Sequence, residues 1–206
     1  MTEDEIFDAI RARVEAGRPT DSSSASLLPP PVSGQVIRDA EAVIGYRLPP
    51  LLRRIYRELG DGGVGPHGGI EGLTNSWSNT PMVDGYLELV SAEAEPGERP
   101  PPPRGVVFFC DLGCAMWALL DCRHPQGQMW WSDEYESCKL HLTLPEWFGA
   151  WLAGDSHDVW ARPGLRLGPS PGTANRPRPP SGTESSCIPI RRPSGDGHAQ
   201  QHDRVR

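Results

Sequence analysis

The chain has 206 residues, enough for one ordinary domain and an additional segment. Hydrophobic residues make up 37% of it, and glycine and proline number 23 each, so the whole chain is too polar to join one packed core. No apolar run approaches the roughly 20 residues of a membrane-spanning helix, and the acidic start lacks a signal-peptide core. The sequence therefore predicts a cytoplasmic protein whose five cysteines are reduced.

Charge is distributed unevenly along the chain. Residues 1–162 hold 24 acidic and 13 basic side chains, a net charge of −11, whereas residues 163–206 hold three acidic and seven basic ones, a net charge of +4. An acidic body repels nucleic acid and anionic membranes, and it attracts basic proteins. The charge therefore favours a basic protein partner over a nucleic acid or a membrane.

The first elements are predicted to be helices. Thr2-x-x-Glu5 has the pattern of a capping box, and Gly17 ends the apolar stripe that follows it. Ser33 is expected to cap a second helix that ends at Gly45. The Pro- and Ser-rich segment between these helices reads as a linker.

Three further segments precede the second linker, residues 94–104. Pro49-Pro50 begins a third helix that Gly60 ends. Residues 70–73 could form a short strand, and residues 82–92 are interpreted as a helix.

A strand-like period begins after the second linker. Residues 106–110 and 115–121 are predicted strands around a tight turn at Asp111-Leu112-Gly113. Residues 128–131 and 139–142 continue an antiparallel meander.

The sheet is expected to be followed by one more helix. Thr143-x-x-Glu146 is a second capping box, and Gly154 closes the helix. Helices, then strands, then a helix favour an α+β fold. The predicted organisation is an N-terminal helix (1–17), a linker (18–32), an α+β domain (33–162) and a disordered Pro/Gly/Arg-rich tail (163–206).

Cofactor motifs are weak. Gly60-x-Gly62-x-x-Gly65 follows a predicted helix, whereas a dinucleotide site needs a preceding strand, so no cofactor is predicted. Four cysteines could form a zinc or thiol site, but their spacing lacks a Cys-x2-Cys knuckle, and buried thiols are the favoured interpretation. These cysteines are Cys110, Cys114, Cys122 and Cys138.

Two regions are candidates for contacting a protein. The first is the loop Asp61-Gly62-Gly63, for which a purely structural turn is the favoured alternative. The second is a group of tryptophans on predicted strands, next to an acidic turn, for which a turn that is simply solvated is the favoured alternative. Adjacent Trp130 and Trp131 must face opposite sides of the sheet, so at least one could be partly exposed as an anchor, unless helices cover both faces. The group comprises Trp117, Trp130, Trp131, Asp133, Glu134 and Glu136.

Several of these features together resemble the SUKH superfamily, the Smi/Knr-type domain. The matching features are Ala40-Glu41, Gly45, Leu48-Pro49, Ile55-Tyr56, Gly62-Gly63, the hairpin Cys110 to Cys122 and the helix Leu144 to Leu152. The likeness covers roughly residues 33–154, with Asp61 where many members have Asn.

The resemblance implies a mostly antiparallel sheet flanked by helices, with no shared catalytic residues. It also implies a protein-binding role, because many bacterial members resemble immunity proteins that bind and silence toxins, often nucleases. The alternatives are a regulatory scaffold without a toxin partner and, third, a thiol- or zinc-dependent enzyme. The first interpretation predicts stoichiometric binding of a basic toxin domain.

Overall fold

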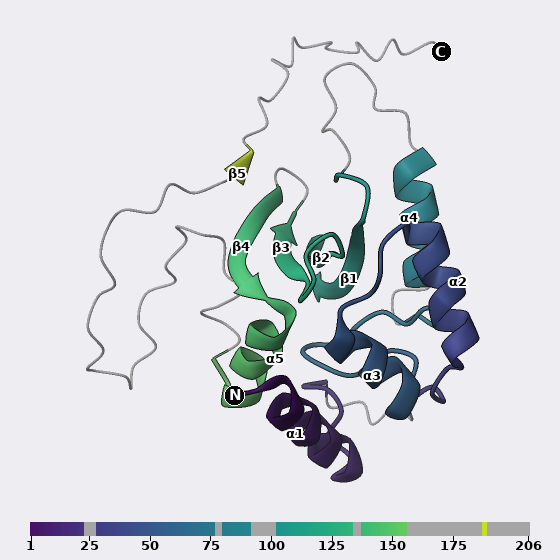
Figure 1. The fold of residues 1–206 in the computed structure, drawn as a ribbon. Helices are drawn as coiled ribbons and strands as arrows, with labels where there is room; N and C mark the ends of the chain where they lie inside the picture. The colour runs from purple at the N-terminus through teal and green to yellow at the C-terminus, as the bar shows by residue number, and fades with distance from the viewer. Residues whose placement is uncertain (23–27, 77–79, 92–101, 134–136, 156–186, 189–206) are drawn as a thin grey trace, which may run out of the picture.

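The computed structural model describes residues 1–22, 28–76, 80–91, 102–133 and 137–155, and the backbone of residues 187–188 (Figure 1). Helices precede the strands along the chain, and one helix follows the meander, which confirms the predicted α+β class. The helices are α1 (Glu3–Glu15), α2 (Gly34–Ile44), α3 (Pro50–Glu58), α4 (Met82–Ser91) and α5 (Leu144–Ala153). The strands are β1 (Val106–Gly113), β2 (Met116–Asp121), β3 (Gln128–Ser132), β4 (Ser137–Thr143) and β5 (Cys187–Ile188).

The helix ends follow the local signals of the sequence. The capping box of α1 is formed, with Thr2 and Glu5 each accepting a hydrogen bond from the other's backbone amide. The carboxylate of Glu146 accepts hydrogen bonds from the backbone amide and hydroxyl of Thr143 at the start of α5. Gly45 and Gly154, which end α2 and α5, have left-handed φ angles of 82° and 78°. Such φ angles strain any residue with a Cβ atom, and this explains glycine at both ends.

The strands form one antiparallel sheet in chain order, β1-β2-β3-β4-β5. Adjacent Trp130 and Trp131 face opposite sides, as predicted, because Trp131 belongs to the main core and Trp130 to a second cluster on the other face. The second cluster comprises Val106, Leu119 and Trp130, with Phe108 and Trp117 packed against it.

The turn between β1 and β2 lies beyond its predicted position. β1 continues through Asp111, Leu112 and Gly113, and the chain reverses at Cys114 and Ala115, whose φ angles are 53° and 60°. Two successive positive φ angles fit the right-handed twist of a hairpin. The prediction placed the turn at glycine, but neither residue at the reversal is of a type that usually signals this conformation.

β1 also contains a bulge. Phe108 pairs with Leu119 and Cys110 with Ala118, so Phe109 has no partner of its own in β2. An inserted residue reverses the alternation of sides beyond it. Phe108 and Asp111, three residues apart, therefore share one face of the sheet.

The helices pack against different neighbours around this sheet. α4 lies beside β1 and packs against α2, whereas α1 packs against α3 and α5 (Figure 1). The buried side of α1 joins the same core as the sheet, so the N-terminal helix is part of one packed body. Its buried side chains are Ile6, Phe7 and Ile10.

Short pairings outside the helices and the four-stranded meander also join distant parts of the chain. The predicted strand over residues 70–73 is reduced to a single bridge between Ile70 and Cys110 in β1. Within the predicted linker 18–32, Thr20 bridges to Gly65. The predicted tail lies outside the described residues except for β5, in which Cys187 pairs with Cys138 of β4.

Candidate functional site

The first candidate contact, the loop Asp61-Gly62-Gly63, is directed inward. Asp61 is 1% exposed, and its carboxylate accepts hydrogen bonds from the backbone amides of Leu73, Thr74 and Asn75 and from two side chains. Gly62 and Gly63 have φ angles of 89° and 72°, so their predicted positive φ is confirmed. The carboxylate organises the following loop, and it has little surface left for a partner.

The tryptophans differ in accessibility. Trp130 and Trp131 are only 6% and 5% exposed, so neither offers the partly exposed ring that the sequence suggested. Each ring is therefore buried on its own face of the sheet. Trp117 is half-buried and remains able to touch another molecule. Of the acidic turn, Asp133 is half-buried, while Glu134 and Glu136 lie outside the described residues.

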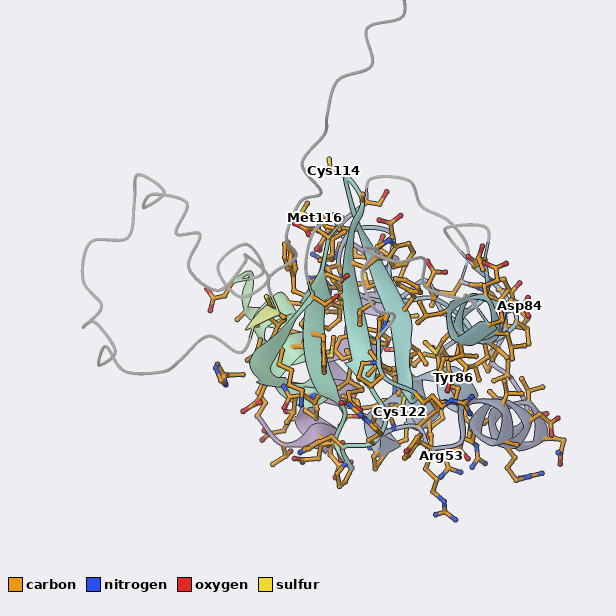
Figure 2. The ribbon with its side chains drawn as sticks, turned by 90° about the horizontal axis from the view of Figure 1, so that it is seen from above. Arg53, Asp84, Tyr86, Cys114, Met116 and Cys122 are labelled. Carbon is orange, nitrogen blue, oxygen red and sulfur yellow. The ribbon has the colours of Figure 1, made fainter. Side chains whose placement is uncertain are left out.

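The cysteines do not converge. Cys114 is exposed at the outer tip of the hairpin, and Cys122 lies at the opposite end of β2 (Figure 2). Burial raises the pKa of the Cys110 thiol well above its ordinary value and that of Cys122 to about 12, so both thiols are protonated. Cys138 is disulfide-bonded, so the expectation that all five cysteines are reduced is wrong for this residue.

Within the described ranges, no three His, Cys, Asp or Glu side chains are grouped so that they could hold a metal ion.

A pocket of about 490 Å³ lies between α4, β1 and the segment that precedes α4. We call it the α4 pocket. The helix contributes residues spaced by three or four positions, which places them on one side of it. The lining residues are Glu71, Thr80, Pro81, Met82, Gly85, Glu88, Leu89, Phe108, Asp111 and Trp117.

The wall formed by the sheet is aromatic. The rings of Phe108 and Trp117 meet edge to face, with centroids 5.0 Å apart and an interplanar angle of 64°. Asp111 pairs with Trp117 across the two strands, so its side chain lies on the same face as both rings. The β1 bulge is what brings this carboxylate to the pocket, because without it Asp111 would point to the opposite face.

The pocket has an acidic character. It is lined by three acidic residues, Glu71, Glu88 and Asp111, and no arginine, lysine or histidine stands among the described residues that line it. Glu71 is 1% exposed, and its backbone is fixed on both sides. Its amide donates to the carbonyl of Phe109 at 2.8 Å, and its carbonyl accepts from the hydroxyl of Tyr56 at 2.6 Å. These two bonds fix the backbone of Glu71 at the wall of the pocket.

Sequence reasoning identified Trp117 but missed the rest of this pocket. The lining residues come from three segments that are distant along the chain, and the bulge conceals that Phe108 and Asp111 share a face. One available signal was Glu71, a charged residue between Ile70 and Gly72 in a stretch otherwise free of charge.

No helix in the described part of the chain is both long and apolar enough to cross a membrane.

Comparison with known proteins gives one family. Residues 31–152 match the model described as the SMI1 / KNR4 family (SUKH-1), and this range is more than half of the chain. No curated protein and no solved structure matches the chain. The matched range extends from just before α2 almost to the end of α5, and so includes the α4 pocket and the four strands of the meander. SUKH domains are protein-interacting modules and are generally not enzymes. The chain is therefore a member of the SMI1 / KNR4 (SUKH-1) family.

Proposed function

We propose that this protein is an immunity-type binding protein that neutralises a basic toxin, a nuclease being the favoured class, by forming a stoichiometric complex. The proposal rests first on membership of a family that includes immunity proteins. The observation that carries it further is electrostatic, since residues 1–162 have a net charge of −11. A nuclease needs positive charge to bind its phosphate backbone, and an acidic protein is complementary to that surface.

The protein would inhibit the toxin by covering part of its surface, and it would not catalyse a reaction. Opposite fields speed the encounter of the two proteins, and contacts that exclude water then slow their dissociation. Trp117 is the described candidate for such a contact, since it is half-buried and lies beside carboxylates. The acidic turn Asp133, Glu134 and Glu136 is proposed to act in steering, where charge matters more than close packing.

The test uses the product of a neighbouring toxin-like gene. Purified toxin and this protein should form a complex with one copy of each, and toxin activity should disappear at that ratio. Association should slow as salt rises, and a triple reversal of Asp133, Glu134 and Glu136 to lysine should slow it further with little change in dissociation. A triple reversal at Asp8, Asp39 and Glu58, which are exposed on α1, α2 and α3, controls for net charge alone.

The result that contradicts this function is equally specific. If no neighbouring toxin-like product binds more tightly than about 1 µM, or if binding ignores salt, the toxin function is wrong. The alternative, a regulatory scaffold with no toxin partner, is then preferred. Co-expression separates the two in cells, because only an immunity protein restores growth to cells that make the toxin.

A further inference from the structure

We propose that the α4 pocket receives an arginine side chain of the protein partner. This inference rests on the proposed function, since it identifies the chemistry by which a basic partner is recognised. The pocket presents what a guanidinium group needs, namely aromatic rings at one wall and carboxylates around them.

The shape of the pocket depends on Gly85. This residue lies in α4, where glycine weakens the helix by roughly 1 kcal/mol relative to alanine. A Cβ atom at this position would meet only the Thr80 methyl group, at 3.5 Å, which is ordinary contact. Nothing in the immediate backbone therefore demands glycine here, and its absent side chain leaves space that a longer one would fill.

Charge gives the second argument. The carboxylates of Glu88 and Asp111 both line the cavity, and neither takes part in the six ion pairs found among the described residues. Asp111 accepts a hydrogen bond from the amide of Gly113 at 2.7 Å, which holds its carboxylate in place. A cation entering the cavity would meet both of these carboxylates.

The protein already uses the same arrangement for its own arginines. Arg13 lies 4.4 Å from the centre of the Trp151 ring, and the carboxylate of Asp21 contacts both groups. Arg54 lies 4.0 Å from the centre of the Phe7 ring and pairs with Asp4 at 2.5 Å. In each case a guanidinium covers an aromatic face while a carboxylate binds its nitrogens. The α4 pocket supplies the ring and the carboxylates of this arrangement, and the partner would supply the guanidinium.

Arginine fits better than lysine for a geometric reason. A guanidinium is planar, so it can stack on the indole of Trp117 and donate sideways to Asp111 at the same time. An ammonium is a strongly hydrated point charge and loses more hydration energy on entering a cavity with an aromatic wall. The pocket should therefore discriminate between the two cations.

The probe for this inference is the peptide acetyl-Gly-Arg-Gly-amide, compared with versions containing lysine or citrulline, a neutral isostere of arginine. Titration into the full-length protein is followed by the indole NMR signal of Trp117, assigned with Trp117→Phe. We expect saturable shifts with a dissociation constant on the order of 1 mM for arginine. Lysine should bind at least threefold more weakly, and citrulline should cause no saturable shift.

Variants locate the binding. Gly85→Leu fills the pocket without changing charge and favours the helix, and it should weaken peptide binding more than tenfold. Asp111→Asn and Glu88→Gln each remove one carboxylate, with expected losses of about tenfold and threefold. The matched control is Asp84→Asn, which removes an exposed charge on α4 outside the lining of the pocket (Figure 2) and should change binding less than twofold. Circular dichroism confirms that each variant is folded.

The outcomes separate this inference from the proposed function. Equal binding of citrulline and arginine, or no effect of Gly85→Leu on the titration, would overturn the pocket assignment. The assignment also fails if a neighbouring toxin binds and Gly85→Leu leaves its dissociation rate unchanged, although the immunity function then stands. If the arginine peptide binds as described but no toxin does, the pocket stands and the partner is a basic protein of another kind.

Discussion

Asp61 accepts hydrogen bonds from both the backbone amide and the hydroxyl of Thr74, at 3.0 and 2.5 Å. The same carboxylate accepts from Leu73 and Asn75, so one buried side chain fixes three successive residues of the loop that leads towards α4. All these partners are donors, a set that suits an ionised carboxylate.

Replacing Asp61 by asparagine tests this relationship. Its amide nitrogen cannot accept a hydrogen bond, so we expect Asp61→Asn to lower the free energy of unfolding by about 1–3 kcal/mol. Urea denaturation measures the loss, and exposed Asp155→Asn is the control. Equal stability of Asp61→Asn and the unchanged protein would show that the loop does not depend on the charge.

Gly62 is predicted to resist substitution for two separable reasons. Its φ angle is 89°, and a Cβ atom would stand 2.6 Å from the amide nitrogen of Gly72. Gly113 has a similar φ of 80°, and an added Cβ atom there would meet nothing within 4 Å. A substitution at Gly113 therefore measures only the cost of placing a side chain on a left-handed backbone. Gly62→Ala should destabilise the protein by at least about 1 kcal/mol more than Gly113→Ala. Thermal unfolding compares them, and equal losses would mean that the contact relaxes freely.

The ion pair between Asp121 and Arg123 predicts that the stability of the fold depends on pH. Burial alone would raise the pKa of Asp121, but hydrogen bonds from Arg123 and its charge outweigh burial and hold this pKa below its ordinary value. A depressed carboxyl pKa contributes stability above the pKa of the unfolded chain, about 4, and this contribution is lost as pH falls through the folded value.

Arg123→Gln should therefore cost about 1–2 kcal/mol at pH 7, and the difference from the unchanged protein should shrink below pH 4. Urea unfolding across pH 2.5–7 measures this, with exposed Arg47→Gln as the control. A difference that stays constant over this range would show that the carboxylate contributes nothing through its ionisation.

The free thiols should differ in reactivity. A pKa of about 12 leaves roughly one in 10⁴ of the Cys122 side chains as thiolate at pH 8, and burial hinders reagents further. Cys110 is also buried, whereas Cys114 is exposed. Native protein should show one fast reaction with a thiol reagent, and Cys114→Ser should abolish it. Fast labelling of Cys122 would contradict its burial in the fold.

Cys138 is disulfide-bonded, so it should not react as a free thiol in the native protein. Peptide mapping without reductant should give a linked peptide that contains Cys138, and reductant should release it. A free Cys138 in protein isolated under thiol-blocking conditions would instead support the reduced state expected of a cytoplasmic protein.

Local features of the fold could be predicted, and features that depend on distant contacts could not. The capping box at Thr2 and the left-handed glycine at Gly45 are set by neighbouring residues, so both follow from the sequence. The turn at Cys114 was misplaced because a bulge lengthens β1, and nothing at Phe109 announces it. The burial of Trp130 depends on what covers the second face of the sheet, which no periodicity reveals.

The candidate site was predictable only in its general chemistry. Acidic charge and tryptophan on strands indicated protein binding, but Glu71, Gly85 and Asp111 meet only after folding. The sequence identified Trp117, the aromatic residue that stays accessible, but it could not separate this residue from Trp130 and Trp131, which are buried.

The margins of the sheet have a consequence for solubility. An open strand edge is a template on which another chain can add a strand and begin to aggregate. Here the amide of Glu71 donates to Phe109 of β1 at one margin, and β5 pairs with Ser137 and Cys138 of β4 at the other. Short flanking segments thus occupy part of each margin, which lowers the tendency of the folded protein to self-associate through strand addition. A ligand that bound as an extra strand would have to displace these flanking segments. Selective recognition of a partner would therefore depend on side chains and not on the edges of the sheet.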